Sequence, residues 1–315
     1  MANRYAVSGS NRSTSTTAAP SIMRLERLAS LTEISAAEWN RLVPDHNPFL
    51  SYEFLSALEQ HGCVGEKTGW LPWHLVCRDG QGQLLGAAPL YLKFNSYGEF
   101  VFDWGWAEAY RRHGQPYYPK LVSAIPYTPS TSPRLLLVSD QPHPQDTEQA
   151  LVDFALEESH RHRLSSIHWL FPIPAELAPL QARGFLPRIG CQFHWRNRGY
   201  RDFQDFLDAF TAKRRKNINR ERRLVREAGL ELRMQSGAAL NESQWRTVHQ
   251  LYRSTFDRLG GAATLTLPFS RDCRDAGRAV TGGAGFRGRP GSGRRDLLAQ
   301  RFHVIRSPLG LPGRL

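Results

Sequence analysis

The composition of the chain changes abruptly near Ser270, and this change limits how much of the chain can form a sheet-based fold. The last 46 residues contain ten Arg and nine Gly but no Lys, Glu, Asn, Tyr or Trp. They carry +7 of the net charge of +12, because they hold only three Asp. Residues 282–295 follow neither helical nor strand periodicity. We therefore expect residues 270–315 to be a disordered Gly/Arg-rich tail.

The rest of the chain has the composition of a globular protein. The whole chain is 41% hydrophobic and has eight Trp, which favours a packed core over disorder. No run approaches the ~18 apolar residues that a membrane span needs. Residues 1–21 lack an apolar segment, so we expect a disordered N-terminal tail and not a signal peptide. The four Cys form no C-x-x-C pair, which argues against a disulfide framework or a metal site and favours a cytoplasmic protein.

Strand-like and helix-like segments alternate along residues 22–269. Strands are predicted at 22–34, 73–77, 84–91, 98–104, 135–138, 166–171, 185–195 and 230–235. Helices are predicted at 36–43 (with Ser35 and Glu38 as a capping box), 51–62, 147–161, 175–182, 203–227 and beyond Asn241. This order predicts a mixed α/β (α+β) fold with mostly antiparallel sheets, divided into a first domain at 22–198 and a second at 199–269.

Six short runs, in this order, resemble the FemAB-like family of the GNAT acyltransferase superfamily. They are NPFLSYEFLSALE at 47–59, GAAPLYLK at 86–93, YGEFVFDW at 97–104, YYPK at 117–120, GCQFHW at 190–195 and KRRKNI at 213–218. The similarity extends from about residue 23 to residue 268. It departs from the family at Asn95, where a His is expected, and in the C-terminal segment.

The resemblance implies two tandem GNAT-like domains that share a cleft. It also implies transfer of an aminoacyl group from a tRNA, or of an acyl group from acyl-CoA, to an amine such as a peptidoglycan precursor. The acyl donor would be a co-substrate and not a tightly bound cofactor. The acyl-CoA loop of ordinary GNAT enzymes is absent from the first unit, where residues 181–185 supply only a Gly-Phe pair at a helix end. Neither donor is therefore favoured by the sequence.

Two acidic residues in the run 97–104 are the first catalytic candidates. Glu99 and Asp103 lie four residues apart, so a strand would place both carboxylates on one face. Tyr97, Trp104 and Trp106 could line an apolar substrate cleft and raise the pKa of a carboxylate, as a general base requires. The alternative is that both carboxylates form structural ion pairs with Lys or Arg.

Further candidates come from the runs at 117–120 and 190–195. His194 is a candidate base or ligand-binding group near the domain junction, with Gln192 beside it as a substrate-binding residue, although a structural His is a simpler interpretation. Tyr118 and Lys120 are candidates for binding an acidic group of the substrate. A solvated loop is the alternative for both.

A basic helix in the second unit gives a different candidate function. Residues 213–226 include eight Lys or Arg, and Lys213, Lys216, Arg220 and Arg223 are candidates for contact with tRNA phosphates or another polyanion. The alternative is a solvated helix face. A non-catalytic RNA- or polyanion-binding protein, using this helix and the Arg-rich tail, is therefore the rival of the acyltransferase. Oligomeric state cannot be inferred from the sequence.

Our hypothesis for the aberrant C-terminus is a shift of reading frame in a GC-rich gene. Out-of-frame translation of such a gene yields Arg, Gly, Pro and Ala, and residues 305–313 admit codons whose +1 frame reads Ser-Gly-Arg-Arg-Trp-Gly-Cys-Arg, close to a run expected of the family. The second domain would then be incomplete and the chain inactive and poorly soluble. The alternative is a genuine flexible tail that binds RNA or anionic surfaces.

Sequencing the gene across the codons for residues 265–315 tests this explanation. We expect a single-nucleotide shift to restore a reading frame that continues the family similarity. An intact +1 frame with no such continuation would contradict it.

Overall fold

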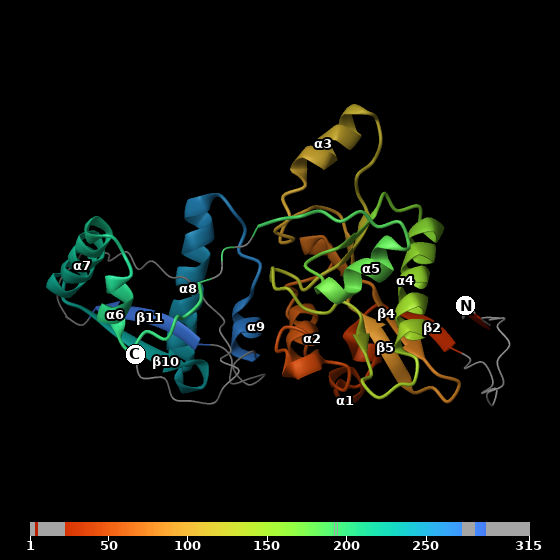
Figure 1. The fold of residues 1–315 in the computed structure, drawn as a ribbon, viewed down its shortest axis with the longest axis horizontal. Coiled ribbons are helices and arrows are strands. Elements are labelled where there is room, and N and C mark those ends of the chain that lie inside the picture. Colours follow the sequence, from red (N-terminus) through yellow and green to blue (C-terminus); the bar gives the residue numbers. More distant parts are fainter. Residues whose placement is uncertain (1–3, 6–22, 192, 194, 273–280, 288–315) are drawn as a thin grey trace. The chain divides into compact units, whose positions relative to one another are not determined.

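The computed structural model describes residues 4–5, 23–191, 193, 195–272 and 281–287 (Figure 1). The chain divides into two compact units: unit 1 is Met1–Gly190 with Thr264–Phe269, and unit 2 is Cys191–Ala263 with Ser270–Leu315. The boundary falls at 190/191, whereas the sequence places it at 198/199. Within the described residues, no helix is long and apolar enough to cross a membrane.

Unit 1 contains two sheets and several short helices. The first sheet has the order β1-β2-β4-β5-β8 and the second has the order β3-β6-β7-β9. Their strands are β1 Arg4–Tyr5, β2 Met23–Leu28, β3 Trp70–Pro72, β4 His74–Arg78, β5 Leu84–Ala88, β6 Leu90–Lys93, β7 Lys120–Ser123, β8 Leu136–Leu137 and β9 Ile167–Trp169. The helices of unit 1 are α1 Ala36–Asn40, α2 Tyr52–Gln60, α3 Trp104–Arg112, α4 Pro144–Arg161 and α5 Leu177–Gln181.

One long hairpin belongs to both sheets. β4 pairs with β5 in the first sheet, and β3 pairs with β6 in the second. Between them, the amide of Trp73 donates to the carbonyl of Leu90 at 2.8 Å, so the pairing continues across the break. Pro89 has no N–H to donate, which explains why the predicted strand 84–91 appears as two strands.

All described strand pairs are antiparallel except β7 with β9, which run parallel. This confirms the predicted mixed α/β class with mostly antiparallel pairing. Helix α4 covers the first sheet, with its buried Leu151, Phe154 and Ala155 in the core that includes Leu75 of β4 (Figure 1). At Gly86 of β5 a Cβ would lie 2.8 Å from a methyl carbon of Thr147, so only glycine allows this close approach.

Helix boundaries follow the caps that the sequence predicts. Ser35 and Glu38 form the capping box at the start of α1, which ends three residues earlier than expected. Asn241 caps α8, whose left-handed Gly260 ends it. The helices of unit 2 are α6 Phe203–Asp208, α7 Ala212–Glu227 and α8 Glu242–Leu259, and α9 Leu267–Asp272 spans the boundary between the two units.

A short segment after α8 returns to unit 1. Phe269 is buried and its ring meets Phe54 edge-on at a centroid distance of 5.6 Å. The amide of Thr266 donates to Cys63 Sγ at 3.4 Å. Residues 264–269 therefore complete the packing around the end of α2, although they are distant from it in sequence.

Three sequence predictions of structure are wrong. Residues 98–104 are not a strand but a loop that leads into α3, because Phe100 and Phe102 adopt positive φ, which an extended strand cannot accommodate. Within the described part of 185–195 there is no strand either. Residues Thr281–Arg287, expected to lack regular structure, form β11, antiparallel to β10 Leu230–Ser236. Backbone pairing needs no apolar side chain, so composition alone does not reveal it.

Candidate functional site

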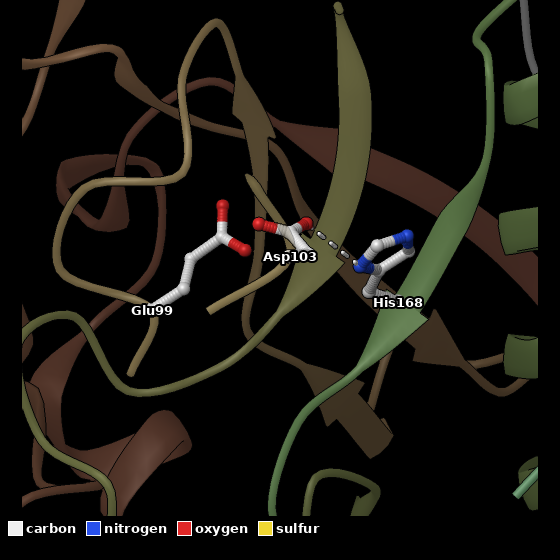
Figure 2. A group of neighbouring side chains, drawn as sticks. All are labelled: Glu99, Asp103 and His168. Carbon is white, nitrogen blue, oxygen red and sulfur yellow. Dashed lines mark ion pairs between the residues drawn. The ribbon is translucent and has the colours of Figure 1, made fainter. Parts of the chain in front are cut away.

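Three segments of unit 1 bring ionisable side chains together: the loop before α3, the start of β7, and β9. The loop turns back at Gly98, which has φ of +80°. A Cβ at this position would lie 2.5 Å from the ring of Tyr127, so the close approach also requires glycine. Figure 2 shows the result: Asp103 lies between Glu99 and His168, with its carboxylate facing both.

Lys120, the first residue of β7, joins the two carboxylates. Its Nζ lies 2.8 Å from Glu99 Oε2 and 2.5 Å from Asp103 Oδ2. All three side chains are buried, and Lys120 is fully inaccessible. Breaking such a pair leaves an uncompensated charge in the interior, so the three residues must be kept together. The alternative interpretation that Lys120 lies in a solvated loop is wrong, and the alternative that the carboxylates pair with a lysine is confirmed.

Neutral hydroxyl groups complete the surroundings of this cluster. Tyr117 donates its hydroxyl proton to Asp103 Oδ2 at 2.6 Å, and Lys120 Nζ donates to Ser96 Oγ at 3.2 Å. The hydroxyl of Tyr118 lies 2.8 Å from Ser96 Oγ. Tyr118 therefore reaches the site through Ser96 and through its ring, whose centre lies 5.8 Å from Lys120 Nζ, which the sequence could not indicate.

The two carboxylates respond differently to the same burial. For Asp103, burial alone would raise the pKa, but hydrogen bonds from Lys120, Ser96 and Tyr117 lower it to about 2. For Glu99, burial dominates and the pKa is raised, although Lys120 partly opposes this. Asp103 thus stays ionised as the fixed anion, and Glu99 is the carboxyl that can exchange a proton.

Each carboxylate also keeps one buried oxygen without a partner. Among the described residues, neither Glu99 Oε1 nor Asp103 Oδ1 makes a hydrogen bond. Buried polar atoms are normally satisfied, so these two acceptors can still receive donors. A protonated Glu99, or an incoming N–H group, would supply one.

Lys93, at the end of β6, is a second buried amine that sequence analysis did not single out. Its Nζ donates to the carbonyl of Tyr97 at 3.2 Å and lies 3.8 Å from the centre of the Trp70 ring. Burial lowers its pKa to about 7, and the nearby Glu99 opposes the change. The only signal in the sequence is its place at the end of a buried strand, where a lysine is unusual.

His168 of β9 was also missed, because it comes from a strand 65 residues after Asp103. Its Nδ1 lies 4.0 Å from Asp103 Oδ2, and its Nε2 lies 3.1 Å from Ser166 Oγ. Burial lowers its pKa to about 4 and the charge of Lys120 adds to this, so the imidazole is neutral at physiological pH.

Glu99, Asp103 and His168 together offer the oxygen and nitrogen ligands that a divalent metal uses, with one ligand atom from each within 4.8 Å of the others. However, the ammonium of Lys120 is already bonded to both carboxylates and supplies the positive charge there. The donor set therefore does not fit a resident metal while Lys120 keeps this position.

The aromatic candidates lie in the loop before α3 and in the first turn of α3. Tyr97, Trp104 and Trp106 are exposed, and the Tyr97 and Trp104 rings meet edge-on at 5.2 Å. They border the carboxylates in sequence, but they do not bury them as a closed apolar cleft would.

The remaining candidates are not part of this cluster. Gln192 and His194 lie outside the described residues. Lys213, Lys216, Arg220 and Arg223 are exposed on α7 in unit 2, where Arg223 pairs with Glu227 at 3.5 Å. The site formed in unit 1 therefore contains Glu99, Asp103 and Lys120, joined by Lys93 and His168.

Comparison with known families agrees with the sequence motifs. The model of the FemAB-like family, described as peptidoglycan biosynthesis/recognition, matches residues 30–279. This range includes every residue of the site described above and ends before the last 36 residues. No curated protein gave a significant match.

The Lys120→Met substitution should test whether the ammonium holds the cluster. It leaves two buried carboxylates without their cation, and we expect a loss of about 3–5 kcal/mol in the free energy of unfolding at pH 8. In the unaltered protein, the depressed pKa of Asp103 stabilises the fold above its unfolded pKa, and this stabilisation is lost as the pH falls toward 2. In the variant both carboxyl pKa values rise, so the variant loses stability as the pH increases.

The deficit of the variant should therefore widen between pH 4 and pH 8, as measured by urea denaturation. Lys67→Met, at an exposed position, is the matched control and should change stability by less than about 0.5 kcal/mol. A deficit that is the same at both pH values would show that Lys120 contributes by packing alone.

Proposed function

Because the chain belongs to the FemAB-like family, described as peptidoglycan biosynthesis/recognition, we propose that it is an N-acyltransferase. The acceptor is an amine, for example of a peptidoglycan precursor, and the donor is an aminoacyl-tRNA or an acyl-CoA. The observation that supports this best is a buried pair of carboxylates bridged by Lys120, in which only Glu99 has a raised pKa.

The chemistry requires a proton acceptor. An amine is protonated at neutral pH and must lose a proton before its nitrogen can attack the acyl carbonyl carbon. In the proposed step this first proton passes to solvent and the N–C bond forms. Glu99 takes the second proton from the attacking nitrogen, and the C–O or C–S bond to the donor breaks. Glu99 then returns the proton to the departing oxygen or sulfur. Asp103 stays ionised, and Lys120, which is bonded to both carboxylates, holds Glu99 in place.

Nearby amines and hydroxyls have supporting roles in this proposal. The ammonium of Lys120 can stabilise negative charge on the acyl oxygen, since electrostatic stabilisation is strong in a buried site. Tyr118 orients Ser96, and Tyr97, Trp104 and Trp106 contact the substrate. His194 as a catalytic residue and Gln192 as a substrate-binding residue remain part of the proposal on the sequence motif alone. The reaction is placed in the cytoplasm, and the abnormal C-terminus is proposed to impair it.

Glu99→Gln removes the proton acceptor but keeps the shape of the side chain. In a chain with the reading frame corrected, we expect turnover to fall by about 10²–10⁴-fold, as for loss of a general base. The activity of the unaltered enzyme should rise with pH through the raised pKa of Glu99, because the ionised form is the base. Turnover is measured with charged tRNA and acyl-CoA donors against a panel of precursor amines.

Glu66→Gln is the matched control, because Glu66 is an exposed glutamate of unit 1, and it should leave turnover unchanged. Equal turnover in Glu99→Gln and the control would exclude Glu99 as the base. No turnover by the frame-corrected chain with any donor would count against the proposed activity as a whole.

A second candidate function rests on α7. This 16-residue helix has no buried residue, and within the described part of the chain no ion pair involves Lys213, Lys216 or Arg220. Three such cations on one exposed helix are suited to phosphate groups. Binding of RNA or another polyanion is therefore the alternative to acyl transfer as the function of the protein. Within the acyltransferase proposal, the same helix would contact a tRNA donor.

The substitution Lys213→Gln/Lys216→Gln/Arg220→Gln should weaken binding to single-stranded RNA and make it less dependent on salt. Each lost phosphate contact reduces the slope of log K against log salt by about 0.7. Lys67→Gln/Arg246→Gln, at exposed cations that do not belong to α7, should change neither quantity. An unchanged slope in the triple variant would rule out α7 as the polyanion site.

A further inference from the structure

In the loop before α3 the acidic side chains are buried and the aromatic side chains are exposed, which is the reverse of the usual arrangement. Glu99 and Asp103 point into the protein, and the large apolar side chains between and around them are exposed. We call these exposed rings the α3 surface, and its members are Phe94, Tyr97, Phe100, Phe102, Trp104 and Trp106. Monomeric proteins seldom expose apolar groups so close together unless they mark an interaction site.

Strained backbone angles accompany this arrangement of buried acids and exposed rings. Phe100 and Phe102 have φ of +60° and +51°, a region that costs a bulky residue about 1–3 kcal/mol each. The ion pairs of Lys120 hold the flanking carboxylates of Glu99 and Asp103 inside, so the phenyl rings between them must turn outward. Phe102 is 73% exposed. The exposed rings do not pack in a way that would offset this backbone strain. Strained backbone of this kind is typical of functional surfaces.

The net charge beside this surface is positive. Between residues 94 and 116, all of which the structure describes, the exposed residues with a permanent charge are Arg111 and Arg112. Glu108 pairs with both, at 2.6 and 3.1 Å, and is only partly exposed, which leaves a net positive charge. The acidic residues of the loop are withdrawn into the Lys120 cluster.

The α3 helix stands apart from the core of unit 1. None of its residues is buried, and Figure 1 shows it projecting from the sheets and helices of this unit. Aromatic rings with neighbouring cations, on a projecting element, are the combination that settles at the boundary between lipid headgroups and acyl chains. A sugar-binding site would need exposed carboxylate or amide groups among the rings, and between 94 and 106 the exposed side chains are all aromatic.

We propose that the α3 surface is a membrane-contact site that inserts its aromatic rings into the headgroup region of a bilayer containing anionic lipid. Trp104 and Trp106 would lie at the level of the headgroups, and Arg111 and Arg112 would face their phosphates. This inference does not depend on the proposed acyl transfer. Membrane contact through the α3 surface would hold the buried carboxylate cluster beside a lipid bilayer, whatever reaction the cluster catalyses.

Sedimentation of the full chain with vesicles tests the proposal. We use phosphatidylcholine vesicles with and without phosphatidylglycerol, at low salt and at about 0.5 M salt, where attraction between exposed charges is largely screened. The high-salt arm matters because the Arg-rich C-terminus could bind anionic vesicles by charge alone. Binding through inserted rings should persist at high salt, since burial of apolar area does not depend on charge.

Phe102→Ala/Trp106→Ala should lower the partition coefficient at high salt by at least about tenfold, because two rings no longer insert. Phe193→Ala is the matched control: Phe193 is 98% exposed in unit 2 and should leave binding unchanged. Arg111→Gln/Arg112→Gln should reduce the preference for anionic vesicles by about fivefold for each net charge removed. Circular dichroism confirms that each variant is folded, and Phe102→Ala alone provides a milder second variant.

Three results would overturn the proposal. The first is vesicle binding by Phe102→Ala/Trp106→Ala equal to that of the unaltered chain. The second is binding that disappears at high salt, which would assign it to charge alone. The third is retention on sedimented peptidoglycan without binding to either vesicle, which would assign the rings to a glycan.

Discussion

The ammonium of Lys120 lies between two buried carboxylates, and most of the site depends on this arrangement. Without it, Glu99 and Asp103 would be two like charges in an interior that does not solvate them. With it, Asp103 remains ionised, Glu99 becomes the group with the raised pKa, and Tyr117 and Ser96 have a fixed anion and cation to bind. The ion pairs also fix the path of the loop, because both carboxylates must reach the same nitrogen.

That path has a consequence on the opposite side of the backbone. Two carboxylates four residues apart cannot both turn inward in this short loop while the intervening phenylalanines also turn inward. The positive φ values of Phe100 and Phe102 are the geometric solution, and the exposed rings are its result. The buried polar site and the exposed apolar surface are therefore two sides of one loop conformation. This links the chemistry proposed for unit 1 to the lipid surface proposed for α3.

Both sheets of unit 1 contribute to the scaffold around the site. The long hairpin runs through both sheets. At its open end Trp70, the first residue of β3, pairs with Lys93, the last residue of β6, and the Trp70 ring lies under the Lys93 ammonium. β7 then supplies Lys120, and β9, parallel to it, supplies His168. The second sheet thus places two lysines and a histidine near one loop. The chain that returns at 264–269 packs on the same unit through Phe269.

Local sequence predicts helix caps well, because a cap depends on residues three positions apart. Ser35 with Glu38 forms the expected box, and Asn241 caps α8 as expected, with Gln244 as its partner. The spacing of Glu99 and Asp103 suggests a strand with both carboxylates on one face. The structure instead has a loop in which the carboxylates are buried and the phenylalanines are exposed. This loop depends on Lys120, which is 17 residues away from Asp103.

The sequence by itself determined the mixed, mostly antiparallel class of fold, the FemAB-like family and several helix starts, and it singled out Glu99 and Asp103 as candidates. Only the tertiary structure decided that Lys120 is buried between them, that Lys93 and His168 join them, and that the aromatic rings face outward. The physical reason is that propensity and periodicity report on neighbours along the chain. The energy of a buried charge, by contrast, depends on which partner the fold brings from a distant strand.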